Sequence, residues 1–334
     1  MMRSLLFLVA TAGVVIAAGA AGQTSLKEQN EKLFQQMQSA RGLTDQQMRT
    51  IRGIFAASGV LGQGNPAISE HPDTPQQCQA RLDSQNINYA NPTFDRICGA
   101  KYMAPLYDPL KEKPEQAKAC IDQFEYPDIP CTYPVVWVKA REAAELCEAE
   151  GKRLCDAHEW EGACAGRLEP PDYRFDLAQG VTSEGAVSRM QAAHNRAHEK
   201  DKSWSYGPAF QRGICAQGSH KTPSCPGGGW SSCGSNTYPT GDFPACHSPL
   251  LAYDLNGNAA EHMNLPLNER QMASRGSKEL GVTEMKGSWF IFDTIRAHED
   301  WCRWRAPFWH GTRVMDPNSH ANYHLGFRCC KSLD

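Results

Sequence analysis

Residues 133–166 read YPVVWVKAREAAELCEAEGKRLCDAHEWEGACAG, and several independent local signals agree within this stretch. Residues 135–138 form a short β-branched and aromatic run, which is typical of a buried strand. Every residue from Ala140 to Glu150 is a fair or good helix former, and Gly151 stands where a left-handed residue ends many helices. The pattern therefore predicts a strand followed directly by a helix.

A second helix is predicted to begin after Asp156. The Asp156 carboxylate can accept a hydrogen bond from the amide of Glu159, and the Glu159 side chain can reach back to the Asp156 amide, which is a capping box. Trp160, Ala163 and Cys164 then fall on one helical face. The stretch as a whole predicts strand, helix, tight turn and helix.

This stretch and four downstream blocks carry a family resemblance. The positions in the stretch are Cys147, Gly151-Lys152-Arg153-Leu154, Glu159-Trp160-Glu161 and Cys164. The downstream blocks are Gly257-Asn258-Ala259-Ala260-Glu261, Gly287-Ser288-Trp289, Arg303-Trp304-Arg305 and Gly326-Phe327-Arg328-Cys329. In this order they resemble the formylglycine-generating-enzyme family, also called sulfatase-modifying factors. The resemblance implies a loop-rich α+β domain of the C-type-lectin-like kind.

The family resemblance also implies two disulfides. In the family, the cysteine of the first signature helix pairs with that of the terminal Gly-Phe-Arg-Cys block, which here joins Cys147 to Cys329. A second family bridge joins the Glu-Trp-Glu helix to the Arg-aromatic-Arg strand, which here gives Cys164 with Cys302. Cys302 precedes Arg303, whereas the family's cysteine follows the second arginine.

The chain has 14 cysteines, an even number that makes disulfides the default in an exported protein. Nearness in the sequence gives guesses for the remaining pairs, although spacing alone cannot fix them. These guesses are Cys78 with Cys98, Cys120 with Cys131, Cys215 with Cys246, Cys225 with Cys233, and Cys155 with Cys330.

Residues 1–20 read as a signal peptide. Arg3 gives a basic start, an apolar run from Leu5 to Ile16 is too short to span a bilayer, and an Ala-Gly-Ala sequence at 18–20 offers a cleavage site. We expect a periplasmic or secreted protein without a membrane span. The formal net charge of -3 and the lack of a basic patch argue against nucleic-acid binding.

The remaining chain divides into three predicted parts. Residues 21–60 are expected to form a helical hairpin, which either packs on the main domain or serves as a docking or dimerisation surface. Residues 61–117 are rich in Pro and Gly and predict an irregular insertion stapled by a disulfide. Residues 118–334 are expected to form the family-like domain.

Calcium is the first candidate ligand. The family binds structural calcium at the Gly-Asn-Ala-Ala-Glu block, and carboxylate, amide and backbone oxygens are the donors that this ion prefers. The resemblance therefore points to Asn258, Glu261 and a backbone oxygen of Ala259 as metal ligands. A turn held only by hydrogen bonds of Asn258 and Glu261 is the alternative.

Copper is not expected. The aerobic family members bind copper(I) with two cysteines just before the Arg-aromatic-Arg strand, but here the first position falls on Ile291 and the second near Arg296 or Trp301. Cys302 alone cannot form a two-thiolate site. A sulfoxide-forming branch of the superfamily holds iron with a His-x-x-x-His-x-Glu helix, yet the N-terminal helices here contain no histidine.

Other residues could bind a metal or a ligand. His194 and His198 lie four residues apart on a predicted helix, a spacing that can bind one metal ion, although no third ligand is evident. Trp301, Trp304 and Trp309 cluster in one loop region and could supply contact area. A catalytic cleft could instead be lined by His298, Glu299, Asp300 and His310.

Together these features favour a non-catalytic, calcium-stabilised domain that binds a protein, peptide or glycan. The alternative is a divergent oxygen- or metal-dependent oxidoreductase related to the sulfatase-modifying enzymes. The catalytic cysteines are not matched, so the sequence leaves open whether the protein is an enzyme.

Overall fold

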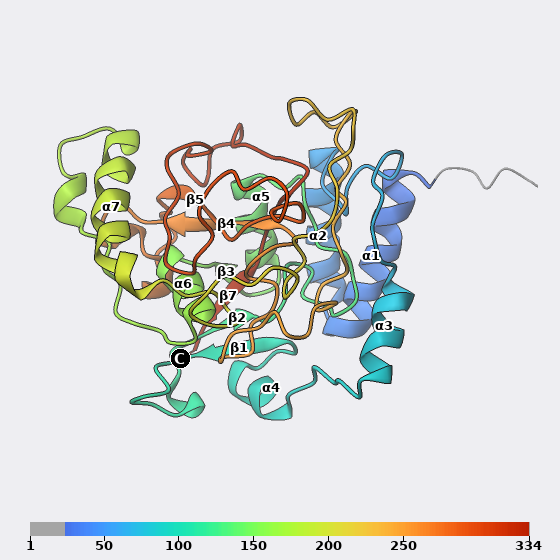
Figure 1. Cartoon of the computed structure of the whole chain (residues 1–334), viewed down its shortest axis with the longest axis horizontal. Helices are drawn as coiled ribbons and strands as arrows, with labels where there is room; N and C mark the ends of the chain where they lie inside the picture. Colours follow the sequence, from blue (N-terminus) through green and yellow to red (C-terminus); the bar gives the residue numbers. More distant parts are fainter. Residues whose placement is uncertain (1–23, 334) are drawn as a thin grey trace, which may run out of the picture.

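The computed structural model describes residues 24–333 and has the predicted α+β architecture (Figure 1). The expected signal peptide lies outside the described residues. The helices are α1 (Leu26–Arg41), α2 (Asp45–Ser58), α3 (Pro75–Ser84), α4 (Pro92–Cys98), α5 (Ala140–Ala149), α6 (Ala157–Ala165) and α7 (Ser183–His198). The strands are β1 (Met103–Leu106), β2 (Ala119–Asp122), β3 (Arg153–Leu154), β4 (Ala260–Leu265), β5 (Val282–Lys286), β6 (Leu325–Phe327) and β7 (Cys329–Ser332).

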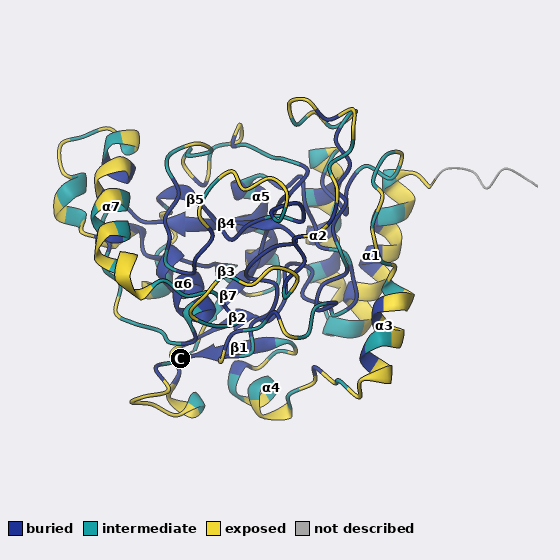
Figure 2. Ribbon diagram, viewed as in Figure 1, coloured by how far each residue is buried: buried dark blue, intermediate teal, exposed yellow. Residues whose placement is uncertain are grey.

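These strands form two small sheets. The first has the order β1-β2-β7-β3 and is antiparallel throughout, with Ile121 of β2 opposite Cys330 of β7. The second has the order β5-β4-β6, in which β4 is antiparallel to β5 and parallel to β6. Helix α6 contacts strands of both sheets, so the principal core lies around its buried Trp160. Both sheets are buried, whereas α1, α3 and α7 expose their outer faces (Figure 2).

The predicted strand at residues 135–138 is wrong, although the run is buried. Its backbone bonds go to separate loops rather than to a ladder: the amide of Val135 donates to Tyr126, that of Val136 to Gly62 and that of Trp137 to Asn322. Trp137 also has a φ of 58°, which is incompatible with an extended strand. A buried apolar run alone does not distinguish a strand from a loop that the core surrounds.

The two helices of this stretch lie where they were expected. Helix α5 ends before Gly151, whose φ is 74°. Helix α6 begins after Asp156, whose amide donates to the Glu159 side chain at 2.9 Å. The Asp156 carboxylate also accepts hydrogen bonds from Ala273 and Ser274, so the helix start is tied to a distant loop.

Helices α1 and α2 form the predicted hairpin. Ser25 and Thr44 cap them, and Gly42 takes the left-handed conformation between them. Their apolar residues, among them Phe34 and Ile51, join a core cluster that contains residues of α5 and β6. The hairpin therefore packs on the main domain.

Residues 61–117 contain helices α3 and α4 and strand β1, and are more regular than expected. Two guessed cysteine pairs in and beside this segment are wrong, because the bonds are Cys78–Cys131 and Cys98–Cys120. Helix α3 packs on the loop that contains Cys131, whereas α4 lies against the β1–β2 pair. Packing in the folded chain therefore pairs these four cysteines differently from the way that their nearness in the sequence suggested.

The other five disulfides join the expected residues, including Cys147 with Cys329 and Cys164 with Cys302. The remaining three are Cys155–Cys330, Cys215–Cys246 and Cys225–Cys233. Seven disulfides indicate an oxidising compartment. Within residues 24–333, no helix is both long and apolar enough to cross a bilayer.

Candidate functional site

The Gly-Asn-Ala-Ala-Glu block leads directly into β4 and is buried. Asn258 takes a left-handed conformation, with a φ of 60°. Its side-chain oxygen accepts from the Tyr238 amide at 2.8 Å, and its amide group donates to Glu125 Oε2 at 2.7 Å. The Ala259 amide donates to the other Glu125 oxygen at 2.6 Å. The turn is thus held by hydrogen bonds within the protein.

The Glu261 carboxylate is held by the guanidinium group of Arg328. Its Oε1 accepts from Arg328 Nη2 at 2.7 Å, and its Oε2 accepts from Arg328 Nε at 2.7 Å and from Trp160 Nε1 at 2.9 Å. Arg328 and Glu261 are both buried, at 0% and 1% exposure. A buried charge of this kind is stable only when it is paired and hydrogen-bonded, and here the pair satisfies both requirements.

This geometry does not fit a calcium ion at Asn258, Ala259 and Glu261. Calcium needs six to eight oxygen ligands. Here both Glu261 oxygens face the Arg328 guanidinium, and the Asn258 side-chain oxygen accepts a hydrogen bond from the Tyr238 amide. Both oxygens of the neighbouring Glu125 also accept hydrogen bonds, from the Asn258 side chain and the Ala259 amide. The block is thus held by hydrogen bonds within the protein, and calcium binding at Asn258, Ala259 and Glu261 stays a prediction.

The same kind of contact links the other signature blocks. Glu161 of α6 accepts from Arg305 Nε at 3.0 Å and from Lys286 Nζ at 2.6 Å, and all three side chains are buried. Trp160 joins this helix to Glu261. The motif residues thus contact one another inside the fold. Sequence reasoning identified the blocks but missed these pairings, since the partners lie far apart along the chain.

Comparison with known proteins decides the family. A family model described as the sulfatase-modifying factor enzyme 1-like domain matches residues 67–333. The chain belongs to this family. The match includes helices α3 and α4, and the proposed division of the chain at residue 118 stays a prediction.

Two solved structures are distantly similar to this chain. PvdO from Pseudomonas aeruginosa is 15% identical, with 70% of this chain and 91% of that chain covered and a TM-score of 0.33. CarF is 12% identical, with 78% of this chain and 82% of that chain covered and a TM-score of 0.32. No curated protein matches the chain.

In this sulfatase-modifying-factor domain, the expected copper position holds no thiol. Ile291 is buried in an apolar cluster, Arg296 stacks on Phe210, and Trp301 is buried. Cys302, the nearest cysteine in the sequence, is bonded to Cys164. Cys225 and Cys233, which share the apolar cluster of Ile291, are bonded to each other. All 14 cysteines lie within the described residues, and each belongs to a disulfide.

Imidazole and indole rings gather beside this position. We call this group the imidazole–indole cluster, and its members are Trp289, His298, Trp304, Trp309, His310, His320 and His324. His298 stacks on Trp304 with ring centroids 5.1 Å apart, Trp289 contacts His324 at 4.1 Å, and His310 stacks on His320 at 4.2 Å. Of the three tryptophans singled out in the sequence, Trp301 and Trp304 are buried, while Trp309 is 50% exposed.

The cluster contains polar atoms without partners. Trp289 Nε1, His298 Nε2 and His324 Nδ1 are buried, and none has a hydrogen-bond partner among residues 24–333. His298 donates through Nδ1 to the Glu299 carbonyl at 2.7 Å, so its Nε2 carries a lone pair. Burial lowers the pKa of His310 to about 4, which keeps that ring neutral near pH 7.

The carboxylates of two residues of the expected cleft, Asp300 and Glu299, have partners outside the imidazole–indole cluster. Asp300 is buried and accepts hydrogen bonds from Trp204, Gln217 and Ser288, so its carboxylate is already satisfied. Glu299 is exposed and lies 3.8 Å from Lys202. The structure therefore brings His298 and His310 together with the tryptophans, while the carboxylates of Asp300 and Glu299 face other partners.

Proposed function

We propose that this chain is a secreted or periplasmic, non-catalytic binding domain of the sulfatase-modifying-factor family. One observation carries the proposal: all 14 cysteines are paired in disulfides, so neither Cys302 nor any other cysteine offers a free thiolate at the family's copper position. Copper(I) sites of the family type need two soft thiolates. A fold that keeps the family frame without these thiolates is suited to binding rather than to oxygen activation.

The imidazole–indole cluster is the binding surface in this proposal. Its exposed Trp309 offers a flat apolar face. Its three unpartnered nitrogens are buried, so they can bond to the hydroxyl groups of a ligand only after the rings around them move. Large aromatic rings with polar edges are common contacts in recognition sites. These properties suit a ligand with both apolar faces and hydrogen-bonding groups, such as a protein, peptide or glycan.

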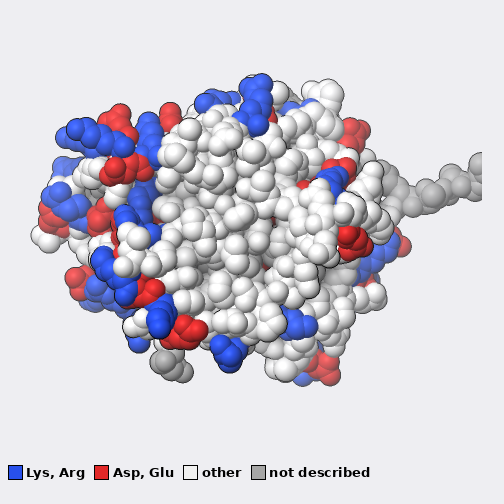
Figure 3. Space-filling view, turned by 60° about the horizontal axis from the view of Figure 1, so that its bottom comes forward, with Lys and Arg blue, Asp and Glu red and all other residues white. Residues whose placement is uncertain are grey.

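Surface charge supports the choice of partner. Lys and Arg side chains alternate with Asp and Glu at the edges of the face in Figure 3, and much of that face is uncharged. A nucleic-acid surface needs a concentrated basic patch. The face in Figure 3 shows no such patch, and together with the formal net charge of -3 this supports partners other than DNA or RNA.

Arrayed glycans and peptides test the binding function. The intact oxidised protein is screened, and each hit is measured again with Trp309→Ala and with Leu110→Ala, a matched control at another exposed apolar residue. We expect Trp309→Ala to weaken binding at least tenfold and Leu110→Ala to leave it unchanged. If both variants bind the ligand equally well, the imidazole–indole cluster is not the binding surface.

The alternative function is a divergent metal- or oxygen-dependent oxidoreductase, which the four histidines of the cluster favour. Copper(I) titration against a chromophoric chelator separates the two functions. The binding-domain proposal predicts that the oxidised protein takes no copper(I) from the chelator. Tight stoichiometric copper(I) binding would support the oxidoreductase.

A further inference from the structure

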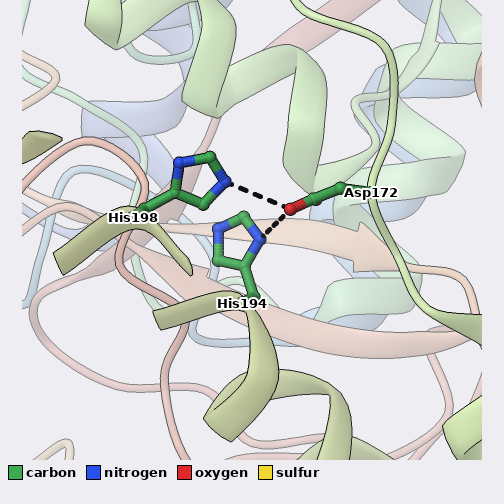
Figure 4. A group of neighbouring side chains, drawn as sticks. All are labelled: Asp172, His194 and His198. Atoms are coloured by element: carbon green, nitrogen blue, oxygen red, sulfur yellow. Dashed lines mark hydrogen bonds and ion pairs between the residues drawn. The ribbon is translucent and has the colours of Figure 1, made fainter. Parts of the chain in front are cut away.

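Helix α7 places two histidines beside an aspartate from the preceding loop. Thr182 caps the helix start, and the buried residues Val187, Met190 and His194 fix the face that packs on the core. His198 follows His194 by one turn. Asp172 lies in the segment between α6 and α7, and its carboxylate points at both imidazoles (Figure 4).

The three side chains present their ligand atoms to one small volume. His194 Nδ1 is 2.7 Å and His198 Nε2 is 3.1 Å from Asp172 Oδ2, and all three atoms lie within 4.8 Å of one another. Ligand atoms of a tetrahedral zinc ion are separated by about 3.4 Å, because each lies about 2.0–2.2 Å from the metal. Only small side-chain movements separate the present arrangement from coordination.

The surrounding contacts orient these ligands. His194 Nε2 is 2.7 Å from the Arg303 carbonyl, which can only accept, so Nε2 carries the proton. With its single proton on Nε2, a neutral His194 would direct the lone pair of Nδ1 toward a carboxylate oxygen, and a cation between the two atoms would remove this repulsion, whereas a doubly protonated ring would donate to Asp172 instead. Metal-bound histidines commonly donate their other nitrogen to a backbone carbonyl in this way.

Arg305 holds the Asp172 carboxylate through the oxygen that does not face the histidines. Its Nη2 donates to Asp172 Oδ1 at 2.9 Å, and its Nε donates to Glu161 Oε1 at 3.0 Å. Asp172 is thus held through Oδ1 while Oδ2 faces the histidines. The Asp172 side chain is 40% exposed and that of His198 is 18% exposed, so water can reach a fourth coordination position.

We propose that Asp172, His194 and His198 bind a divalent first-row transition-metal ion of the Zn²⁺ type. Two imidazoles and one carboxylate suit such ions better than calcium or magnesium, which prefer oxygen ligands alone. The site joins α7 to the segment that contains Arg303 and Arg305. It is separate from the imidazole–indole cluster and does not depend on what that cluster binds.

Zinc titration of the intact, chelator-treated protein tests the site, with a chromophoric chelator as competitor. His198→Gln is the main variant, since this histidine lies at the helix end and is partly exposed. His220→Gln is the control, because His220 is exposed and bonds only to Glu70 through its ring. We expect one zinc per wild-type chain, a loss of affinity of at least 100-fold in His198→Gln, and no change in the control.

Cobalt(II) provides a second readout. The wild-type protein is expected to give the intense visible bands of a four-coordinate ion, and His198→Gln is expected to lose them. Equal zinc affinity in wild type and His198→Gln, or no zinc binding at micromolar concentrations, overturns the proposal. A third variant, His310→Gln, tests whether zinc binds at the imidazole–indole cluster instead. If His310→Gln loses zinc binding while His198→Gln keeps it, the proposal is also overturned.

Discussion

Glu261 and Arg328 form a buried ion pair with two hydrogen bonds of 2.7 Å, although 67 residues separate them in the sequence. The pair joins β4 to the short segment between β6 and β7, and Trp160 of α6 binds the same carboxylate. The positions with the strongest family resemblance thus stabilise the frame of the domain.

Removing the negative charge from this pair should destabilise the protein strongly. Glu261→Gln removes the charged partner that makes both side-chain hydrogen bonds to the buried Arg328 guanidinium, and breaking such a pair costs about 3–5 kcal/mol. Glu148→Gln is the control, because its partner Lys278 is exposed and surface pairs contribute little. Urea unfolding measures both variants. A Glu261→Gln loss no larger than that of the control contradicts the structural role.

Calcium should not stabilise the protein through Asn258, Ala259 and Glu261. The side-chain oxygens of Asn258 and Glu261 already accept hydrogen bonds, the first from Tyr238 and the second from Arg328 and Trp160. We expect millimolar calcium, added to chelator-treated protein, to leave the melting temperature unchanged. A rise of several degrees that is lost in Asn258→Ala would show that the block binds the ion.

His262 should make stability depend on pH. Burial lowers its pKa from 6.5 to about 3 in the folded protein, where Nε2 donates to the Val138 carbonyl and Nδ1 accepts from Thr283. Below pH 6.5 the unfolded chain takes up a proton that the folded chain does not, so this contribution is complete above pH 6.5 and is lost as pH falls toward 3.

His262→Gln isolates this effect, because glutamine can make both hydrogen bonds but does not titrate. The difference in unfolding free energy between wild type and variant should shrink by about 1.4 kcal/mol per pH unit below pH 6.5. His310 and His320, which also lower the pKa of His262, are present in both proteins. A difference that stays constant between pH 6.5 and 4 contradicts this account.

Local signals predicted the elements well where the responsible contacts are close in the sequence. The Asp156–Glu159 contact and the left-handed Gly151 set the ends of α5 and α6, and each involves residues within one or two turns. Residues 135–138 were different, because their hydrogen-bond partners are Gly62, Tyr126 and Asn322. No pattern within the run reveals those partners.

Site chemistry was harder to predict for the same reason. Asn258 and Glu261 are the right residue types for calcium, but Arg328 occupies the carboxylate from across the fold. The third metal-binding candidate beside His194 and His198 is Asp172, 22 residues before the first histidine in a segment without regular periodicity. A lone Asp in such a loop carries no signal until the fold places it.

Counting free thiols tests most directly whether the family's copper chemistry is absent. The protein is unfolded without reductant, treated with iodoacetamide and weighed by mass spectrometry, with a reduced sample as the positive control. Because all 14 cysteines are paired, we predict no alkylation before reduction and 14 alkylated cysteines after it. Two alkylated cysteines in the unreduced sample, one of them Cys302, would contradict the account.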